Sequence, residues 1–191
     1  MKNYKKALVV EGGGQRGVFS FGITDTFIKK SFDPFDIYIG VSNGVAVLCW
    51  YLIRETENNL EKMLYASRGD YINYKNIFTT KDIIKFHQMY KDGERMINGR
   101  RKFDGGIVDP LPVQKAYEMG AKQITVIRTY EASFRRKLKI ENYIGAFFLG
   151  QYPKLKKALL DHNKTYNRAL DFIENPPSDC KIIQLCPPQR L

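Results

Sequence analysis

Histidine, cysteine and tryptophan are scarce in this chain of 191 residues, which contains two, three and one of them respectively. The cysteines Cys49, Cys180 and Cys186 are odd in number and show no C-x-x-C spacing, which argues against a disulfide framework. We therefore expect a reduced, cytoplasmic setting. Only two histidines, His87 and His162, are available to any catalytic site.

Long hydrophobic runs are absent as well. No stretch reaches the roughly 18 apolar residues that a membrane-spanning helix needs, so any contact with a membrane is expected to be peripheral. The basic N-terminal residues are followed by an apolar run of residues 7–10 only, and then by acid and glycine. This pattern does not predict a signal peptide.

Positive charge is in excess, with 31 Lys and Arg against 20 Asp and Glu, which favours anionic partners. Nucleic acid is not expected among them, because the sequence has no RNP-like aromatic run, zinc-finger spacing or basic helix with heptads. The basic segment 128–139 has two interpretations. In the first, it rests on an anionic bilayer, where each basic residue contributes about 1 kcal/mol of binding energy. In the second, it is a solvated loop, and the charge run alone slightly favours this second interpretation.

Hydrophobic periodicity predicts an α/β fold. A short buried strand at residues 7–10 leads through glycines into a helix at about 17–30, and a second strand at 35–39 leads into a helix that follows Ser42. A strand, glycine loop and helix that occur twice in succession are typical of a largely parallel sheet. With 43% hydrophobic residues, we expect one domain over residues 1–191.

The rest of the chain carries further helix and strand signals. A capping box predicts a helix at 79–90, and the motif Asp109-Pro110-Leu111-Pro112 predicts another that Gly120 ends. Strands are expected at 123–127 and 181–185, with mostly helical spacing over 143–174 that is broken near Pro153. The polar segment 92–102 is expected to be a loop.

Three short motifs along this framework together describe an acyl-transfer site. The Gly40-Val41-Ser42-Asn43-Gly44 motif places Ser42 on a sharp turn between a strand and a helix, where its hydroxyl is exposed and faces the positive helix N-terminus. An incidental serine in a glycine-rich turn is the alternative. The apolar strand before the turn and the apolar helix after it favour the nucleophile.

The glycine-rich motif at 12–17 can present several backbone N–H groups to an oxyanion. It also fits a phosphate-binding turn, because it follows a strand and opens a helix. No Gly-Lys-Ser/Thr follows, so it is not a Walker loop, and Asp33 and Asp36 are poor candidates for a dinucleotide-site acid. Arg16 neutralises an anion or braces the loop through a carboxylate, and the sequence weighs these two roles equally.

The third motif, Asp104-Gly105-Gly106, offers a carboxylate to take the proton of the serine. A turn aspartate alone is commonplace, so this motif counts only as a member of the set. Chain order also permits a triad of Ser42, Asp104 and His162. The polar surroundings of His162 favour a solvated helix residue instead, and thus a Ser–Asp dyad.

The three motifs, in this order, resemble those of the patatin-like phospholipase family. The resemblance implies a three-layer α/β/α fold with a mostly parallel sheet, and hydrolysis of acyl esters of phospholipids or lysophospholipids without a metal or cofactor. The implied catalytic dyad is Ser42 and Asp104. The implied oxyanion hole draws on Gly12, Gly13, Gly14, Arg16, Gly17 and Asn43.

The interval between nucleophile and aspartate is short for this family, because Asp104 follows Ser42 by only 62 positions. We expect part of the family's core to be missing between about residues 75 and 100. Either residues are missing from the sequence shown or the protein is genuinely shortened. The second case leaves open a catalytically inactive, membrane-associating relative.

Overall fold

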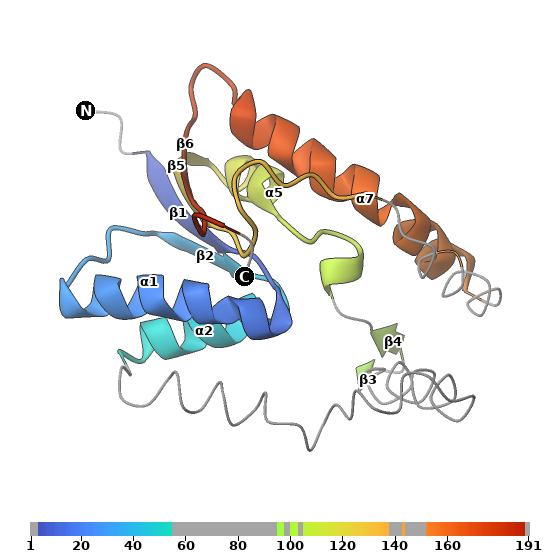
Figure 1. The fold of residues 1–191 in the computed structure, drawn as a ribbon, viewed down its shortest axis with the longest axis horizontal. Coiled ribbons are helices and arrows are strands. Elements are labelled where there is room, and N and C mark those ends of the chain that lie inside the picture. The colour runs from blue at the N-terminus through green and yellow to red at the C-terminus, as the bar shows by residue number, and fades with distance from the viewer. Residues whose placement is uncertain are drawn as a thin grey trace.

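A computed structural model describes residues 4–54, 95–97, 100–102, 105–137, 143 and 152–189. At its centre lies a parallel sheet with the strand order β2-β1-β5-β6 (Figure 1). The strands are β1 (Lys5–Val10), β2 (Ile37–Gly40), β5 (Ala121–Ile127) and β6 (Lys181–Leu185). Helices α1 (Gly17–Lys29) and α2 (Asn43–Leu52) cover one face, and α5 (Val113–Glu118) and α7 (Pro153–Glu174) cover the other. This arrangement confirms the predicted three-layer α/β/α fold.

Residues 7–10 of strand β1 are apolar without interruption because this part of the strand is buried on both faces. Ala7 and Val9 pack into the core shared with α5 and α7, whereas Leu8 and Val10 pack into the core shared with α1 and α2. All four side chains are fully buried. A central strand of a parallel sheet needs apolar residues on both sides, so the run at 7–10 has no polar alternation.

Each helix buries the residues along one of its faces against this sheet. On α2 the buried residues are Gly44, Val47, Leu48 and Tyr51. Helix α5 begins directly after the predicted opening motif, because Pro112, the last residue of that motif, is its N-cap. Gly120 follows the end of α5 with a φ of 94°, a backbone conformation that suits glycine and agrees with the predicted stop.

The expectation of a loop over 92–102 was wrong. The structure pairs β3 (Arg95–Ile97) and β4 (Arg100–Lys102) as antiparallel strands. Each strand has only three residues and four of the six are basic, so the hydrophobic pattern gave no signal for them, although the Asn98-Gly99 dipeptide between them in the sequence is a strong hairpin signal. The predicted helix at 79–90 lies outside the described residues.

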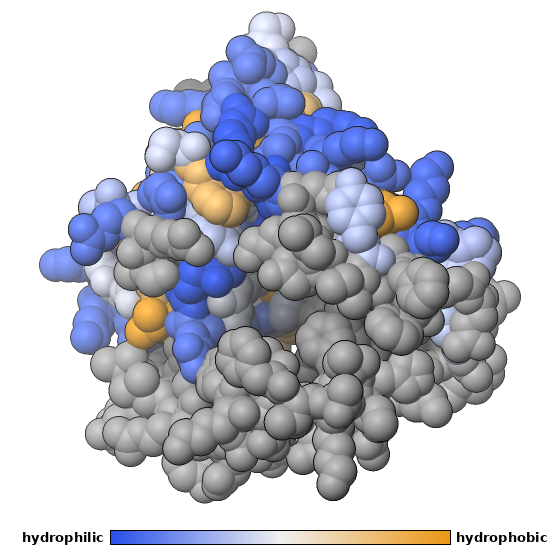
Figure 2. Space-filling model, turned by 45° about the vertical axis from the view of Figure 1, so that its right-hand side comes forward, coloured by the Kyte–Doolittle hydropathy of each residue, from blue (hydrophilic) through white to orange (hydrophobic). Residues whose placement is uncertain are grey.

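The described surface is mostly hydrophilic on the face drawn in Figure 2, and its hydrophobic residues form separate small patches. Among the helices of the described ranges, none combines the length and apolar character that crossing a bilayer requires. The described residues also contain no group of three or more histidine, cysteine or acidic side chains placed to hold a metal ion.

Candidate active site

Three loops meet at the carboxyl edge of the sheet. The loops that follow β1 and β2 carry the glycine motif and Ser42, and the loop that follows β5 begins at Arg128. The chain leaves β1 toward α1 on one face, and it leaves β5 toward α7 on the opposite face (Figure 1). The carboxyl ends of β1 and β5 therefore form a topological switch point, the place where open parallel sheets bind their ligands.

Ser42 occupies a sharp turn between β2 and α2, with φ 52° and ψ −123°. Such a backbone conformation costs about 1–3 kcal/mol in a residue other than glycine. Ser42 is the N-cap of α2, yet its side chain makes no capping hydrogen bond, and the residue is exposed. A serine that caps nothing and contacts solvent keeps its hydroxyl available for chemistry.

The flanking glycines are required by the close approach of β1. A Cβ atom on Gly44 would lie 2.4 Å from the carbonyl oxygen of Val10, and one on Gly40 would lie 2.6 Å from the Gly44 backbone. The Val41 N–H donates to the same Val10 oxygen at 3.2 Å. The turn that carries Ser42 is thus packed directly onto the end of β1.

The glycine loop lies between the Ser42 turn and the loop after β5. A Cβ atom on Gly12 would lie 2.6 Å from the Val41 carbonyl oxygen and 3.0 Å from the Ser42 Cβ, and one on Gly13 would lie 2.6 Å from Thr129 Oγ1. Asn43 Nδ2 donates to the Gly14 carbonyl at 2.9 Å. The structure therefore brings the first two motifs into contact.

The loop amides divide into used and unused groups. The Arg16 N–H donates to the Gly13 carbonyl at 3.2 Å, and the Gly17 N–H donates to carbonyl oxygens of the same loop. Within the described ranges, the N–H groups of Gly13, Gly14 and Asn43 donate to no acceptor. The Gly12 N–H likewise donates to no acceptor among the described residues, so four of the six residues expected at an oxyanion hole have amides free to bind a ligand.

Asp104 lies outside the described residues, but the two glycines that follow it begin a 3₁₀ turn at Gly105–Ile107. This turn packs beside α7. His162, on α7, places its Nε2 at 3.0 Å from the Gly106 carbonyl oxygen. Because a carbonyl only accepts, Nε2 carries the hydrogen in this contact.

The expectation of a solvated His162 was therefore wrong, since the side chain is partly buried and bonded to the third motif. Burial and the nearby Arg136 charge lower the pKa of His162, against the opposing effect of its bond to Gly106. His162 is thus held as a neutral donor.

Sequence reasoning missed two residues that brace the glycine loop, Glu11 and Thr129. The Thr129 N–H donates to Glu11 Oε2 at 2.7 Å, and its hydroxyl donates to the Gly12 carbonyl at 3.2 Å. Burial raises the pKa of Glu11, although the Thr129 N–H bond, the Tyr166 hydroxyl and the arginine charges oppose it. The signal for Glu11 was an acid placed directly between a buried strand and three glycines.

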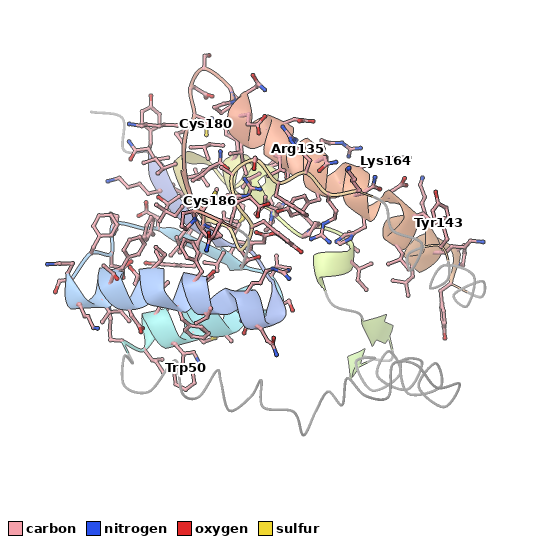
Figure 3. The ribbon with its side chains drawn as sticks, viewed as in Figure 1. Trp50, Arg135, Tyr143, Lys164, Cys180 and Cys186 are labelled. Carbon is pink, nitrogen blue, oxygen red and sulfur yellow. The ribbon has the colours of Figure 1, made fainter. Side chains whose placement is uncertain are left out.

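Two arginines of the basic segment at 128–139 are used within the fold. Arg128 is 1% exposed and donates to Ala132, Phe134 and Gln184 oxygens. Arg135 forms ion pairs with Asp171 and Glu174 of α7, beside which it lies in Figure 3. Neither arginine is therefore available to an anionic bilayer.

The fold and the Ser42 turn define an α/β protein of the class that presents a serine on a strand-to-helix elbow. Residues 8–93 match the family described as patatin-like phospholipase, and residues 152–191 match a domain of unknown function, DUF6363. The match over residues 8–93 confirms the resemblance to patatin-like phospholipases that the three motifs predicted.

A relative from Escherichia coli (strain K12), "Uncharacterized protein YjjU", is 28% identical over 254 residues, which cover 97% of this chain and 69% of the relative. That alignment is longer than the chain itself, so it includes positions of the relative that have no counterpart here.

Proposed function

We propose that this protein is a serine acyl hydrolase that cleaves acyl esters of phospholipids or lysophospholipids. The observation that carries the proposal is the exposed, uncapped Ser42 on a strained turn, packed against a glycine loop with unused amides. The family description, patatin-like phospholipase, supports lipid esters as the substrate class.

In the proposed reaction, Ser42 Oγ attacks the ester carbonyl carbon while the Asp104 carboxylate takes the hydroxyl proton. The N–H groups of Gly13, Gly14 and Asn43 stabilise the oxyanion, and each such donor typically contributes about 3 kcal/mol. The tetrahedral intermediate collapses and expels the alcohol, to which Asp104 returns the proton. A water molecule activated by Asp104 then hydrolyses the acyl-enzyme and releases the fatty acid.

The position of His162 supports a dyad rather than a triad. Its Nε2 is bonded to the Gly106 carbonyl, whereas a triad histidine has to bond the serine through one nitrogen and the aspartate through the other. The lowered pKa of His162 reflects burial beside Arg136, a cation that disfavours the imidazolium that a triad forms.

Replacement of His162 by alanine is expected to leave most of the esterase activity, with a loss of less than tenfold. The variant loses one hydrogen bond to Gly106, which costs about 1 kcal/mol of stability. His162→Gln, whose amide retains a donor, is the matched comparison and should lie closer to the parent. Steady-state kcat with a p-nitrophenyl ester decides the point, since a loss above about a thousandfold in both variants would establish a triad.

The direct test of the proposed function is release of fatty acid, measured by mass spectrometry, from lysophosphatidylcholine and phosphatidylcholine. We expect free fatty acid that increases linearly with time and with protein concentration. If the protein is folded by circular dichroism and releases no fatty acid from these lipids or from a short-chain p-nitrophenyl ester, it is an inactive member of its family.

A further inference from the structure

Two arginines from different loops converge on one tyrosine at the switch point of the sheet. Arg16 comes from the glycine loop after β1, and Tyr130 and Arg136 come from the segment after β5. The guanidinium carbons of Arg16 and Arg136 lie 4.1 Å and 5.7 Å from the centroid of the Tyr130 ring. The carbon of Arg136 also lies 4.7 Å from the centroid of the Tyr166 ring.

The tyrosine is itself fixed by a stacked neighbour. The rings of Phe134 and Tyr130 are nearly parallel, with an interplanar angle of 6° and centroids 3.8 Å apart. Phe134 therefore covers one face of Tyr130, and Arg16 covers the other. A guanidinium that stacks through its face keeps its N–H donors in the plane, where they remain free to bind an oxyanion.

These donors are unused. Within the described parts of the chain, neither guanidinium donates a hydrogen bond, and no carboxylate oxygen lies within 4 Å of either. The Nε atoms of both Arg16 and Arg136 are buried and lack a partner. Arg135, by contrast, pairs with two carboxylates of α7. A buried donor without an acceptor is costly, which is the condition that a bound anion relieves.

The local charge balance is positive. Arg128 lies fully buried on the same loop, Glu131 is the acid nearest to it in the sequence, and the charges of Arg128 and Arg136 act on Glu11. Glu11 is buried and already accepts the Thr129 N–H, and it forms no ion pair with either guanidinium. The positive charge of Arg136 also helps to keep its neighbour His162 neutral.

We propose that Arg16 and Arg136, held on the Tyr130 ring, form a phosphate-binding site at the switch point and that this site takes the phosphate of a lipid headgroup. The proposal rests on the proposed lipid hydrolase activity, because Arg16 follows the oxyanion loop by two residues and Ser42 packs against that loop. The paired N–H donors of an arginine guanidinium can bind two phosphate oxygens at once. Both guanidinium groups are held by the same Tyr130 ring. Neutral glycerides carry no group for this site.

The test measures binding by isothermal titration calorimetry with inorganic phosphate and with glycerophosphocholine, a headgroup phosphodiester without acyl chains. We expect glycerophosphocholine to bind and Arg136→Gln to weaken it at least tenfold. Lys137→Gln is the matched control, because it removes the same charge from the exposed neighbouring residue, and it should bind within twofold of the parent. Arg136→Lys keeps the charge without the fork and should fall between them.

Failure of glycerophosphocholine to bind, or equal weakening in Arg136→Gln and Lys137→Gln, would overturn the site. Binding of inorganic phosphate alone would overturn the assignment to a headgroup. No turnover is needed, so these outcomes are independent of the proposed reaction. If the protein hydrolyses lipids, the ratio of kcat/KM for lysophosphatidylcholine to that for monoacylglycerol should also fall at least tenfold in Arg136→Gln, and an equal loss on both substrates would indicate a merely structural arginine.

Discussion

Ser42→Ala is expected to lower the rate of ester hydrolysis by about 10⁴-fold or more without disturbing the fold. The reason is that Ser42 is exposed and its hydroxyl makes no capping bond, so the methyl group of alanine costs little in packing or hydrogen bonding. In the proposed reaction the missing oxygen is the nucleophile, so no acyl-enzyme can form. The assay is kcat on a p-nitrophenyl ester, with thermal unfolding measured in parallel.

Two further variants make this experiment specific. Ser178→Ala removes an exposed serine that precedes β6, at the opposite edge of the sheet, and should retain the full rate. Asp104→Asn should lose activity to a degree comparable with Ser42→Ala, because an amide cannot take the serine proton. Retention of the parental rate by Ser42→Ala would remove the proposed mechanism.

Gly44→Ala is expected to have the largest effect on stability, a loss of about 2–4 kcal/mol. The added Cβ would lie 2.4 Å from the Val10 carbonyl oxygen and 3.1 Å from that of Glu11, and both are backbone atoms that cannot move aside cheaply. To relieve this contact, α2 has to withdraw from β1 and carry Ser42 away from the glycine loop. Esterase activity should therefore fall with stability.

Gly22→Ala provides the matched comparison for this substitution. Gly22 lies inside α1, is exposed, and a Cβ atom there would meet nothing within 4 Å. Alanine should stabilise this helix position by about 0.5–1 kcal/mol. The free energies of unfolding of both variants come from urea titration, and an unchanged value for Gly44→Ala would contradict the packing of the Ser42 turn described above.

Local sequence patterns predicted the parts of the fold that depend on local chemistry. The continuous apolar run of β1 and the glycines that follow it indicated a buried parallel strand and a turn, and the structure has both. The β3–β4 pair was missed because each strand has only three residues and four of the six are basic, which leaves no hydrophobic alternation to recognise. The sequence signal for this pair is the Asn98-Gly99 dipeptide, which is typical of hairpin turns.

The candidate site shows the same division between local and long-range information. The Ser42 turn and the free amides of the glycine loop follow from glycines close in sequence. The support from Thr129 and the contact of His162 with Gly106 join residues more than 50 positions apart. These distant residues meet because β1 pairs with β5 and because α7 packs onto the fold. No local sequence pattern encodes such tertiary contacts.

Arg16 illustrates how tertiary structure adds an alternative that sequence did not contain. The sequence left it to bind an anion or to brace the loop through a carboxylate. In the described structure it stacks on Tyr130 instead, with its donors unused. Stacking on Tyr130 braces the loop without a carboxylate and leaves the positive charge of Arg16 available to a ligand. This favours the role of anion binding.

The central claim is that Ser42 is an activated nucleophile, and covalent labelling tests it most directly. A fluorophosphonate probe reacts with an activated serine hydroxyl, forms a bond between the serine oxygen and phosphorus, and expels fluoride. We predict one adduct per chain, mapped by peptide mass spectrometry to Ser42 and absent after Ser42→Ala. Failure of the folded protein to react, or an adduct on a different serine, would contradict the account.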